Sequence, residues 1–433
     1  MKFVCVSPNL DFMNKIESFV YNVVRKNPAL KQFVRNVYQS VFDLFPRKKD
    51  FFRGDIDFKE DYFFGFHDVT PLSADETRLL AMHNDFDLRM PSQNEALSVG
   101  YVDFKDGKLE DYHEIGKSFS WNYHKGCRLQ WIDNDRLIYN TAIDGNLCST
   151  IYNVANEINE EIPYPIDSVF IGKGKQLASS FSYERLERCM PGYGYHYSDG
   201  GLIEEAAPET TGLYIVDLVS KQRRLLLSLA DIARKVTGKI ETEYIHFVTH
   251  SEFSHTGRYL AFLYRRIPRE GDYMKRRSVM CVFDFNTEEL IVLPSQESGS
   301  HYVWNHQDKI IASCNIDGKN CHALFDLNNL SEVHMVDAAH LNSDGHQSFI
   351  TDTSFVTDTY PDKFRMAKLF VADIPTDTSR IIANIYSPKK FQTKDFHCHI
   401  ACDLHPRILA NGKYVCFDSP RTGKRGLYVM TLK

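Results

Sequence analysis

The sequence lacks the features of exported, membrane-spanning and nucleic-acid-binding proteins. No apolar run approaches the roughly 20 residues of a membrane span. The first residues reach Asn9 and Asp11 too soon to form a signal-peptide core. The 10 cysteines have no framework spacing, which is typical of reduced thiols in the cytosol. With 51 basic against 57 acidic residues, no global field favours nucleic acid. The sequence therefore predicts a cytoplasmic protein with no nucleic-acid partner.

Several familiar catalytic motifs are also missing. The chain has no phosphate-binding loop, no dinucleotide fingerprint and no serine nucleophile elbow. Aromatic residues are plentiful instead, with 23 Tyr and 30 Phe. This composition favours short strands packed face to face.

A short pattern occurs four times in the C-terminal half of the chain. Each copy has a histidine, two further residues, a bulky apolar residue, a polar turn and a β-rich run. The copies start at His250, His301, His346 and His405, so they lie 51, 45 and 59 residues apart. That period is the length of a four-stranded blade and predicts a β-propeller. Equivalent positions of successive blades surround one axis, so we expect the four histidines to converge on the central channel.

Three further blades are predicted before these four copies. They start near Phe66, Gly126 and Asp167, which makes seven blades and an all-β fold over residues 51–433. A strand within residues 51–58 is expected to complete the last blade, because a closed ring leaves no exposed sheet edge. The Tyr- and Gly-rich segment 182–211 lies inside the third blade, and a loop of that length is usually functional or mobile.

Residues 1–50 are predicted to form a separate, short α-helical N-terminal extension. Apolar residues at three- and four-residue spacings from Ile16 to Phe45 predict two amphipathic helices, broken near Pro28. Residues 11–50 carry eight basic and four acidic side chains. We expect a helical cap on the propeller or on a partner. The alternative is a helix pair that docks on a membrane surface or on a protein.

The C-terminal repeats also predict a metal site. Histidine with cysteine or carboxylate is a suitable donor set for zinc. His301, His346 and His405 occupy equivalent blade positions, Cys402 precedes His405 by three residues, and Asp358 is a further candidate. We therefore predict a bound divalent metal, zinc rather than manganese. The alternative is a hydrogen-bonded histidine layer in the channel, with Cys402 merely buried.

Six short motifs, in chain order, resemble the seven-bladed polysaccharide lyases. The resemblance is to the ulvan-lyase-like families and, more distantly, to the oligogalacturonate lyases, and it covers roughly residues 62–433. The motifs are Gly126–Trp131, Pro191–Tyr195, Ser300–Trp304, Asp344–Ser348, Thr357–Asp362 and Cys402–Arg407.

The resemblance implies cleavage of uronate-containing glycans by β-elimination. In such enzymes a base removes the proton at C5, an acid protonates the leaving oxygen, and positive groups neutralise the uronate carboxylate. This chain departs from the family in two respects. Met190 stands where an arginine is expected before Pro191, with Arg188 two residues earlier. Ulvan-type lyases are exported, and nothing in this sequence directs export.

Four residues are candidates for the proton transfers. His124 lies just before the Gly126–Trp131 motif, and the pKa of an imidazole is near the working pH of a general base. Tyr193 and Tyr195 serve as acid or base if adjacent positive charge lowers their pKa. His250 belongs to the histidine repeat. The alternative for each is a structural role, as a histidine at a blade turn or a tyrosine packed in a loop.

Four further residues are candidates for substrate binding. Arg188 or Arg185 could hold the uronate carboxylate bidentately, and Arg128, at the histidine-equivalent position of blade two, is a further candidate for binding an anion. His67 lies where blade one begins, although a His-Asp pair often only ties a turn together.

The predicted function is a polysaccharide or oligosaccharide lyase that acts on an acidic glycan in the channel cleft. The alternative is a non-catalytic propeller that binds glycan or serves as a scaffold in surface (capsular) polysaccharide biosynthesis, since fold alone does not decide activity.

Overall fold

The computed structural model describes residues 40, 42–43, 48–86, 88–270, 275–393 and 397–433. The chain divides into two compact units, Met1–Lys48 with Asp362–Phe364, and Lys49–Pro361 with Arg365–Lys433. In the first unit, Phe42 packs edge-on against Phe364, with ring centroids 5.0 Å apart. The two predicted N-terminal helices lie almost wholly outside the described residues, so those helices and their docking role stay predictions.

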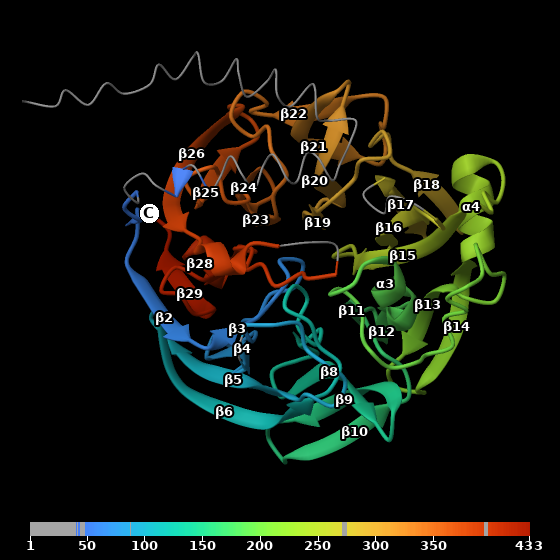
Figure 1. The fold of residues 1–433 in the computed structure, drawn as a ribbon, viewed down its shortest axis with the longest axis horizontal. Helices are drawn as coiled ribbons and strands as arrows, with labels where there is room; N and C mark the ends of the chain where they lie inside the picture. Colours follow the sequence, from blue (N-terminus) through green and yellow to red (C-terminus); the bar gives the residue numbers. More distant parts are fainter. Residues whose placement is uncertain (1–39, 41, 44–47, 87, 271–274, 394–396) are drawn as a thin grey trace, which may run out of the picture. The chain divides into compact units, whose positions relative to one another are not determined.

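The second unit consists of seven antiparallel sheets arranged around one axis, which confirms the predicted all-β seven-bladed propeller (Figure 1). Blade one contains β3 (Tyr62–Phe63), β4 (Arg78–His83), β5 (Leu97–Lys105) and β6 (Lys108–Ser118), and blade two contains β7 (Gln130–Trp131), β8 (Arg136–Ile143), β9 (Asn146–Asn153) and β10 (Ile158–Ile162). Blade three contains β11 (Val169–Gly172), β12 (Lys175–Ser180), β13 (Gly212–Asp217) and β14 (Gln222–Ser228), and blade four contains β15 (Tyr244–Phe253), β16 (Tyr259–Pro268), β17 (Arg277–Asp284) and β18 (Glu289–Val292). Blade five contains β19 (Tyr302–Trp304), β20 (Lys309–Ile316), β21 (Lys319–Asp326) and β22 (Val333–Val336). Blade six contains β23 (Gln347–Thr351), β24 (Ser354–Asp358), β25 (Met366–Asp373) and β26 (Thr378–Tyr386), with β1 (Phe51–Phe52) at its edge. Blade seven contains β27 (Arg407–Leu409), β28 (Tyr414–Ser419), β29 (Gly426–Thr431) and β2 (Ile56–Glu60).

Local sequence explains the hairpins within the blades. Asp144–Gly145 joins β8 to β9 with φ angles of 50° and 79°, and Asp317–Gly318 joins β20 to β21 with φ of 50° and 78°. Positive φ at both residues defines a type I′ turn, which matches the right-handed twist of the flanking strands and favours Asp-Gly. Between blades the packing is apolar: Leu263 of blade four belongs to the same buried cluster as Trp304 of blade five.

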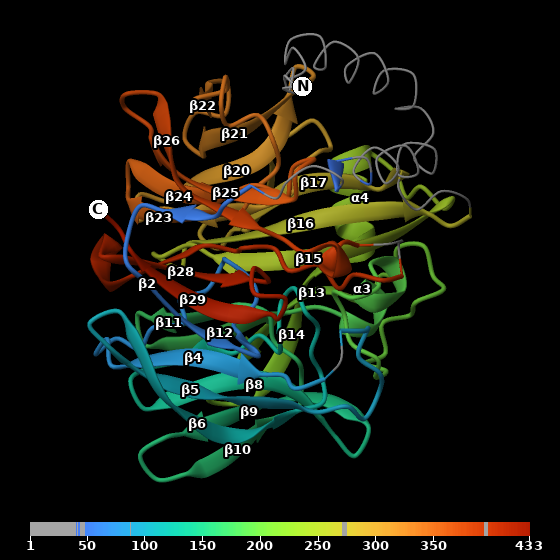
Figure 2. The same ribbon diagram turned by 60° about the vertical axis from the view of Figure 1, so that its left-hand side comes forward.

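The ring is closed by a strand from the N-terminal side. All five residues of β2 pair with β29, from Ile56 opposite Met430 to Glu60 opposite Gly426. In both ribbon views β2 lies beside β29 (Figures 1 and 2). The predicted closing strand is therefore confirmed, although its first part differs: β1 pairs with β26 and adds a fifth strand to blade six.

Two α-helices are inserted between the strands. Helix α3 (Tyr183–Cys189) lies in the long segment within blade three, and the side chain of Ser182 caps its N-terminus. The sequence pattern did not predict α4 (Leu229–Thr237), which has Ser228 as N-cap and Gly238 as C-cap at φ 76°. Short 3-10 turns span Lys389–Phe391 and Ala410–Gly412.

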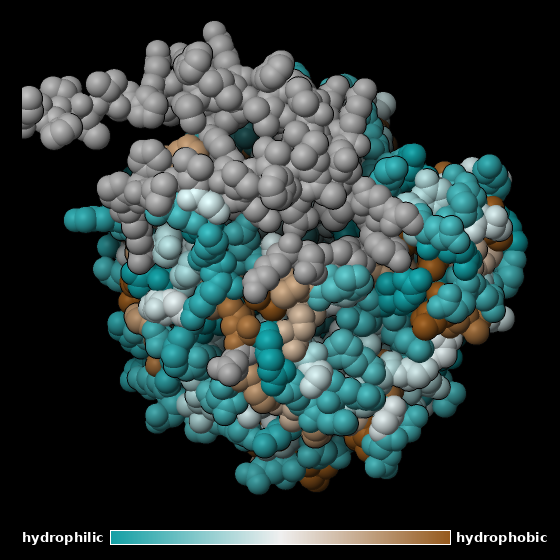
Figure 3. Space-filling view, in the orientation of Figure 1, coloured by the Kyte–Doolittle hydropathy of each residue, from teal (hydrophilic) through white to brown (hydrophobic). Residues whose placement is uncertain are grey.

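On the face shown in Figure 3, the described residues are mainly hydrophilic. The face in Figure 3 has apolar residues only in separate areas among hydrophilic ones. Within the part of the chain that the structure describes, no helix has the length and apolar character needed to cross a membrane.

Candidate functional site

A ring of histidines surrounds Phe66 on the propeller axis. The four repeated histidines come from blades four to seven, and His67 joins them from blade one. Centroid distances from the Phe66 ring are 4.5 Å to His67, 4.9 Å to His250, 5.8 Å to His301, 5.9 Å to His346 and 5.1 Å to His405. The predicted convergence of the repeat is therefore present. The channel at this level is filled by an aromatic side chain.

Three of these histidines have the same tautomer imposed on them. In each, Nδ1 faces an oxygen that can only accept, so Nδ1 carries a proton, and Nε2 keeps a lone pair wherever the ring is neutral. The pairs are His67 with the Gln347 carbonyl at 2.7 Å, His301 with Asp344 at 3.1 Å and His346 with Asp358 at 2.9 Å. Carboxylates and carbonyls behind a histidine in this way are typical of metal-binding imidazoles.

The ring is largely uncharged. Burial lowers the pKa of His67, His250 and His405 well below the ordinary value, and lowers that of His301 as well. His346 is the exception. Burial acts against its charged form, but the carboxylates of Asp358, Asp403 and Asp344 together raise the pKa of His346 above the ordinary value.

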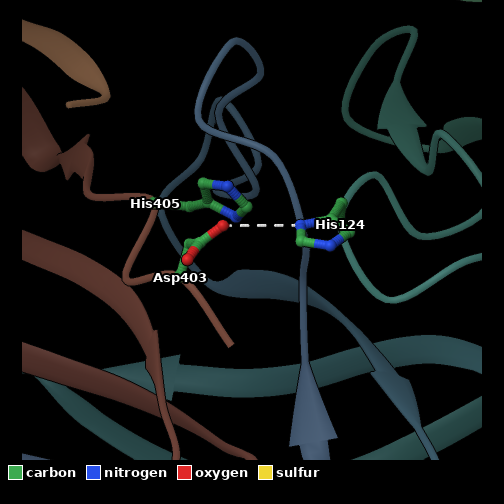
Figure 4. A group of neighbouring side chains, drawn as sticks. All are labelled: His124, Asp403 and His405. Carbon is green, nitrogen blue, oxygen red and sulfur yellow. Dashed lines mark ion pairs between the residues drawn. The ribbon is translucent and has the colours of Figure 1, made fainter. Parts of the chain in front are cut away.

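A metal-binding geometry lies beside this ring. Within the described ranges, only His124, Asp403 and His405 form a group of three buried donors whose ligand atoms lie within 4.8 Å of one another (Figure 4). His124 Nδ1 is 3.5 Å from an oxygen of Asp403, while Nε2 of His124 and Nε2 of His405 are buried and have no hydrogen-bond partner among the described residues. Burial would raise the pKa of Asp403, yet His124 lowers it below the ordinary value, which keeps the carboxylate ionised. Two imidazoles and a carboxylate fit a divalent zinc-like or manganese-like ion.

Of the four predicted metal ligands, only His405 belongs to this group. Cys402 is buried, and burial raises the pKa of its thiol to about 12. Cys402 is not among the three donor groups that lie together, whereas its neighbour Asp403 is. His301 and His346 lie in the ring, with their centroids 4.1 Å apart.

Asp358 supports the histidines and is not in the donor group. Its carboxylate accepts from the backbone N–H of His346 at 2.8 Å and from that of His405 at 3.0 Å. Together with the bond to the His346 ring, these contacts orient two neighbouring blades about the axis.

Tyr193 is stacked on His124. Their centroids are 4.6 Å apart and their planes differ by 7°. The ring of Tyr193 is half-buried and also lies 6.2 Å from His250 and 5.6 Å from His399. Burial raises the pKa of the Tyr193 phenol, as does the charge of Asp403, whereas nearby arginines act to lower it. Among the described residues, no hydrogen bond to its hydroxyl is present.

Arg265 of β16 is a buried guanidinium without a carboxylate partner in the described part of the chain. It is 2% exposed and donates to the Ser278 hydroxyl at 2.9 Å and the Met190 sulfur at 3.1 Å. Its charge acts on Tyr193 and Asp344, and burial lowers the pKa of Arg265 to about 9, which still leaves it charged at neutral pH. A buried, unpaired charge is costly, so it indicates a place for an anionic ligand.

The predicted carboxylate-binding arginines have other partners. Arg128 forms a two-pronged ion pair with Asp68 at 2.8 and 3.0 Å and a further one with Asp167 at 3.0 Å. Arg185 donates to five backbone carbonyls between 2.6 and 3.1 Å. Both guanidiniums are therefore bound within the fold, and their substrate role stays a prediction. Arg188 is partly exposed, 3.9 Å from Glu204.

Tyr195 lies apart from Tyr193, although both belong to one motif. It is fully buried, stacks on Tyr183 at 4.3 Å and accepts a hydrogen bond from the Asn140 side chain at 3.0 Å. Of the two predicted tyrosines, therefore, only Tyr193 lies beside His124.

Sequence reasoning missed three residues at this site. Asp403 stands inside the Cys402–His405 motif, and the preference of zinc-like sites for carboxylates could have identified it. His399 reads as an ordinary loop residue, yet its ring lies 6.0 Å from His124. Arg265 occupies an apolar strand, where no local pattern distinguishes it from a structural arginine.

No known protein family matches the chain, and no curated protein matches it in sequence. Solved structures do match. An oligogalacturonate lyase in complex with manganese is 14% identical, with a TM-score of 0.59, over 90% of this chain and 99% of that chain. An oligogalacturonate lyase from Vibrio parahaemolyticus is 11% identical, with a TM-score of 0.37, over 88% of this chain and 98% of that one. The first match shows a shared propeller fold, and the resemblance to ulvan-lyase-like families stays a prediction.

Proposed function

We propose that the protein is a lyase that cleaves uronate-containing oligosaccharides by β-elimination. The observation that supports this most directly is the buried, unpaired guanidinium of Arg265, whose charge acts on Tyr193. Substrates of this class bring a carboxylate to such a group. One known structure of similar fold is an oligogalacturonate lyase, whose name implies a uronate substrate.

In this proposal Arg265 binds the carboxylate of the uronate. A guanidinium neutralises that carboxylate and so makes the C5 proton more acidic. Met190, which stands where the related lyases are expected to have an arginine, contacts Arg265 through its sulfur. Blade four therefore supplies the positive charge that the blade-three loop does not.

Tyr193 is the group to which we assign proton transfer at C5. The stack on His124 fixes its ring, and its hydroxyl has no hydrogen bond to lose within the described residues. Burial opposes the phenolate, so the positive charges of Arg276 and Arg265, which lower the pKa of Tyr193, are required for this role.

His124, Asp403 and His405 would hold a divalent ion, which when bound adds positive charge near the substrate carboxylate. His124 then serves as a ligand and as the surface on which Tyr193 rests.

The test is incubation with oligogalacturonate and other uronate oligosaccharides, following the absorbance of the unsaturated product. Tyr193→Phe keeps the stacked ring and removes the hydroxyl, so kcat should fall by about 10²- to 10⁴-fold with little change in binding. Tyr195→Phe is the matched control, two residues away but buried against Tyr183, and should retain turnover.

His124→Ala tests the assignment of His124 as a metal ligand. Loss of bound metal together with turnover identifies a ligand, and loss of turnover with metal retained leaves the support of Tyr193, or the proton transfer predicted from the sequence, as its role. If wild type binds uronate oligosaccharides and releases no unsaturated product, the protein is a glycan-binding propeller and the lyase proposal is wrong.

A further inference from the structure

His124 and Tyr193 come from different blades, yet one side chain joins the two turns that present them. The amide nitrogen of Asn122 donates to the carbonyl oxygen of Tyr193 at 3.0 Å and to that of Gly194 at 3.4 Å. Its oxygen accepts from the backbone N–H of His124 at 3.1 Å and of Lys125 at 2.7 Å. Asn122 is 1% exposed, and all four of its hydrogen-bonding positions are used.

The opposite side of the Tyr193 turn is held by Glu187, from the last turn of α3. Its carboxylate accepts from the N–H of Gly192 at 2.9 Å and from that of Gly194 at 3.1 Å. Gly194 itself is pressed against the helix: a Cβ there would lie 2.2 Å from the Tyr183 carbonyl and 2.3 Å from the Glu187 nitrogen. The turn therefore has its carbonyls held by blade two and its N–H groups held by α3.

We propose that Asn122 is a positioning residue that locks the His124 and Tyr193 turns into one unit, with Glu187 securing the far side. The inference rests on the proposed function, because it assigns a role to the stack of His124 on Tyr193. Preorganised placement of this kind matters because a displacement of about 1 Å can reduce turnover by about 10²-fold.

Asn122→Asp is the most informative variant, because it changes only one side of the contact. It keeps the acceptor for the N–H groups of His124 and Lys125, but it places a carboxylate oxygen against the two carbonyl oxygens of the Tyr193 turn. When that carboxyl is protonated at lower pH, it regains a donor. We therefore expect the Tyr193 turn to loosen at neutral pH and to tighten again on acidification, which the loss of a purely structural contact would not produce.

Asn305→Asp is the matched control. Asn305 is also 1% exposed, donates to the Asp352 carbonyl of the next blade at 3.1 Å, and accepts from two N–H groups of its own turn at 3.0 and 2.9 Å. Its bonding pattern resembles that of Asn122, with one donated bond in place of two, but it joins blades five and six.

Hydrogen exchange followed by mass spectrometry, corrected for the intrinsic effect of pH, measures the turn without substrate. For Asn122→Asp we expect exchange in residues 190–196 to be at least about tenfold faster at neutral pH, with partial recovery on acidification. Residues 122–127 should keep their protection, and Asn305→Asp should leave 190–196 unchanged.

Wild-type protection of residues 190–196 in a folded Asn122→Asp protein would overturn the proposal. If that variant does not fold, Glu187→Gln tests the same turn from the other side, and unchanged exchange in 190–196 would be equally decisive. Kinetics then follow: kcat should fall while KM changes little. Because exchange is read without substrate, a protein that cleaves no uronate glycan can still show the loosened turn, so the two proposals can fail independently.

Discussion

Replacing His250 with asparagine should change how the stability of the propeller depends on pH. Burial, followed by the charges of Lys125 and Arg265, holds the pKa of His250 well below its ordinary value. The folded protein therefore keeps this imidazole neutral, whereas the unfolded chain protonates it below a pH of about 6.5. The wild type accordingly loses stability as pH falls from that value toward the folded pKa.

The magnitude follows from proton linkage. Protonation of the unfolded chain sets the upper limit: one such histidine costs at most RT ln(1 + 10), or about 1.4 kcal/mol, at pH 5.5 and almost nothing at pH 7.5. Asparagine removes the titrating group and tolerates the left-handed φ of 54° at this position. The stability advantage of wild type over His250→Asn should therefore be smaller at pH 5.5 than at pH 7.5, by up to about 1.4 kcal/mol.

Urea unfolding in the presence of a chelator, at several pH values, measures this difference. His346→Asn is the contrasting variant, because nearby carboxylates, chiefly Asp358, raise the pKa of His346 despite burial. The stabilisation from these carboxylates is complete below a pH of about 6.5 and is lost as pH rises through the folded pKa, so the wild-type advantage should grow on acidification. A pH-independent difference for His250→Asn, or the same sign in both variants, would refute the reasoning.

Other changes test the metal set, the anion position and the buried charges. Elemental analysis should find about one divalent transition metal per chain, lost in His405→Ala and kept in Cys402→Ser; protein that neither contains nor takes up metal would exclude the site. Arg265→Met should leave the unfolding free energy unchanged or raised, because an unpaired buried charge is removed, while kcat/KM on uronate oligosaccharides falls by about 10²-fold; unaltered kinetics would remove Arg265 from the site. Lys125→Met removes one of the two cations paired with the buried Asp167 carboxylate, at 2.6 Å, and leaves Arg128 at 3.0 Å, so urea unfolding should show a loss of about 1–3 kcal/mol; a loss below about 1 kcal/mol would contradict this. Deletion of residues 1–48 should leave a cooperatively unfolding propeller, since β2 closes the ring without them; loss of the cooperative transition would show that they complete the core.

The architecture could be predicted because it depends on a period and on local rules. The spacing of His250, His301, His346 and His405 matches one blade, and equivalent residues of successive blades must surround the same axis. Asp-Gly turns determine hairpins within a few residues, and a ring of sheets needs a closing strand because a free edge is unfavourable. None of these inferences requires knowing which side chains meet across blades.

The site itself was decided by contacts between distant blades. His124 of blade two meets Asp403 and His405 of blade seven, and whether Asp403 or Cys402 supplies the donor depends on which of two adjacent side chains faces that neighbour. The arginines show the same limit. Arg128 and Arg265 are both buried, and only the tertiary structure shows that the first has carboxylate partners while the second has none within the described residues. Whether a buried arginine can bind an anionic ligand depends on its neighbours in space, and those neighbours are not adjacent in the chain.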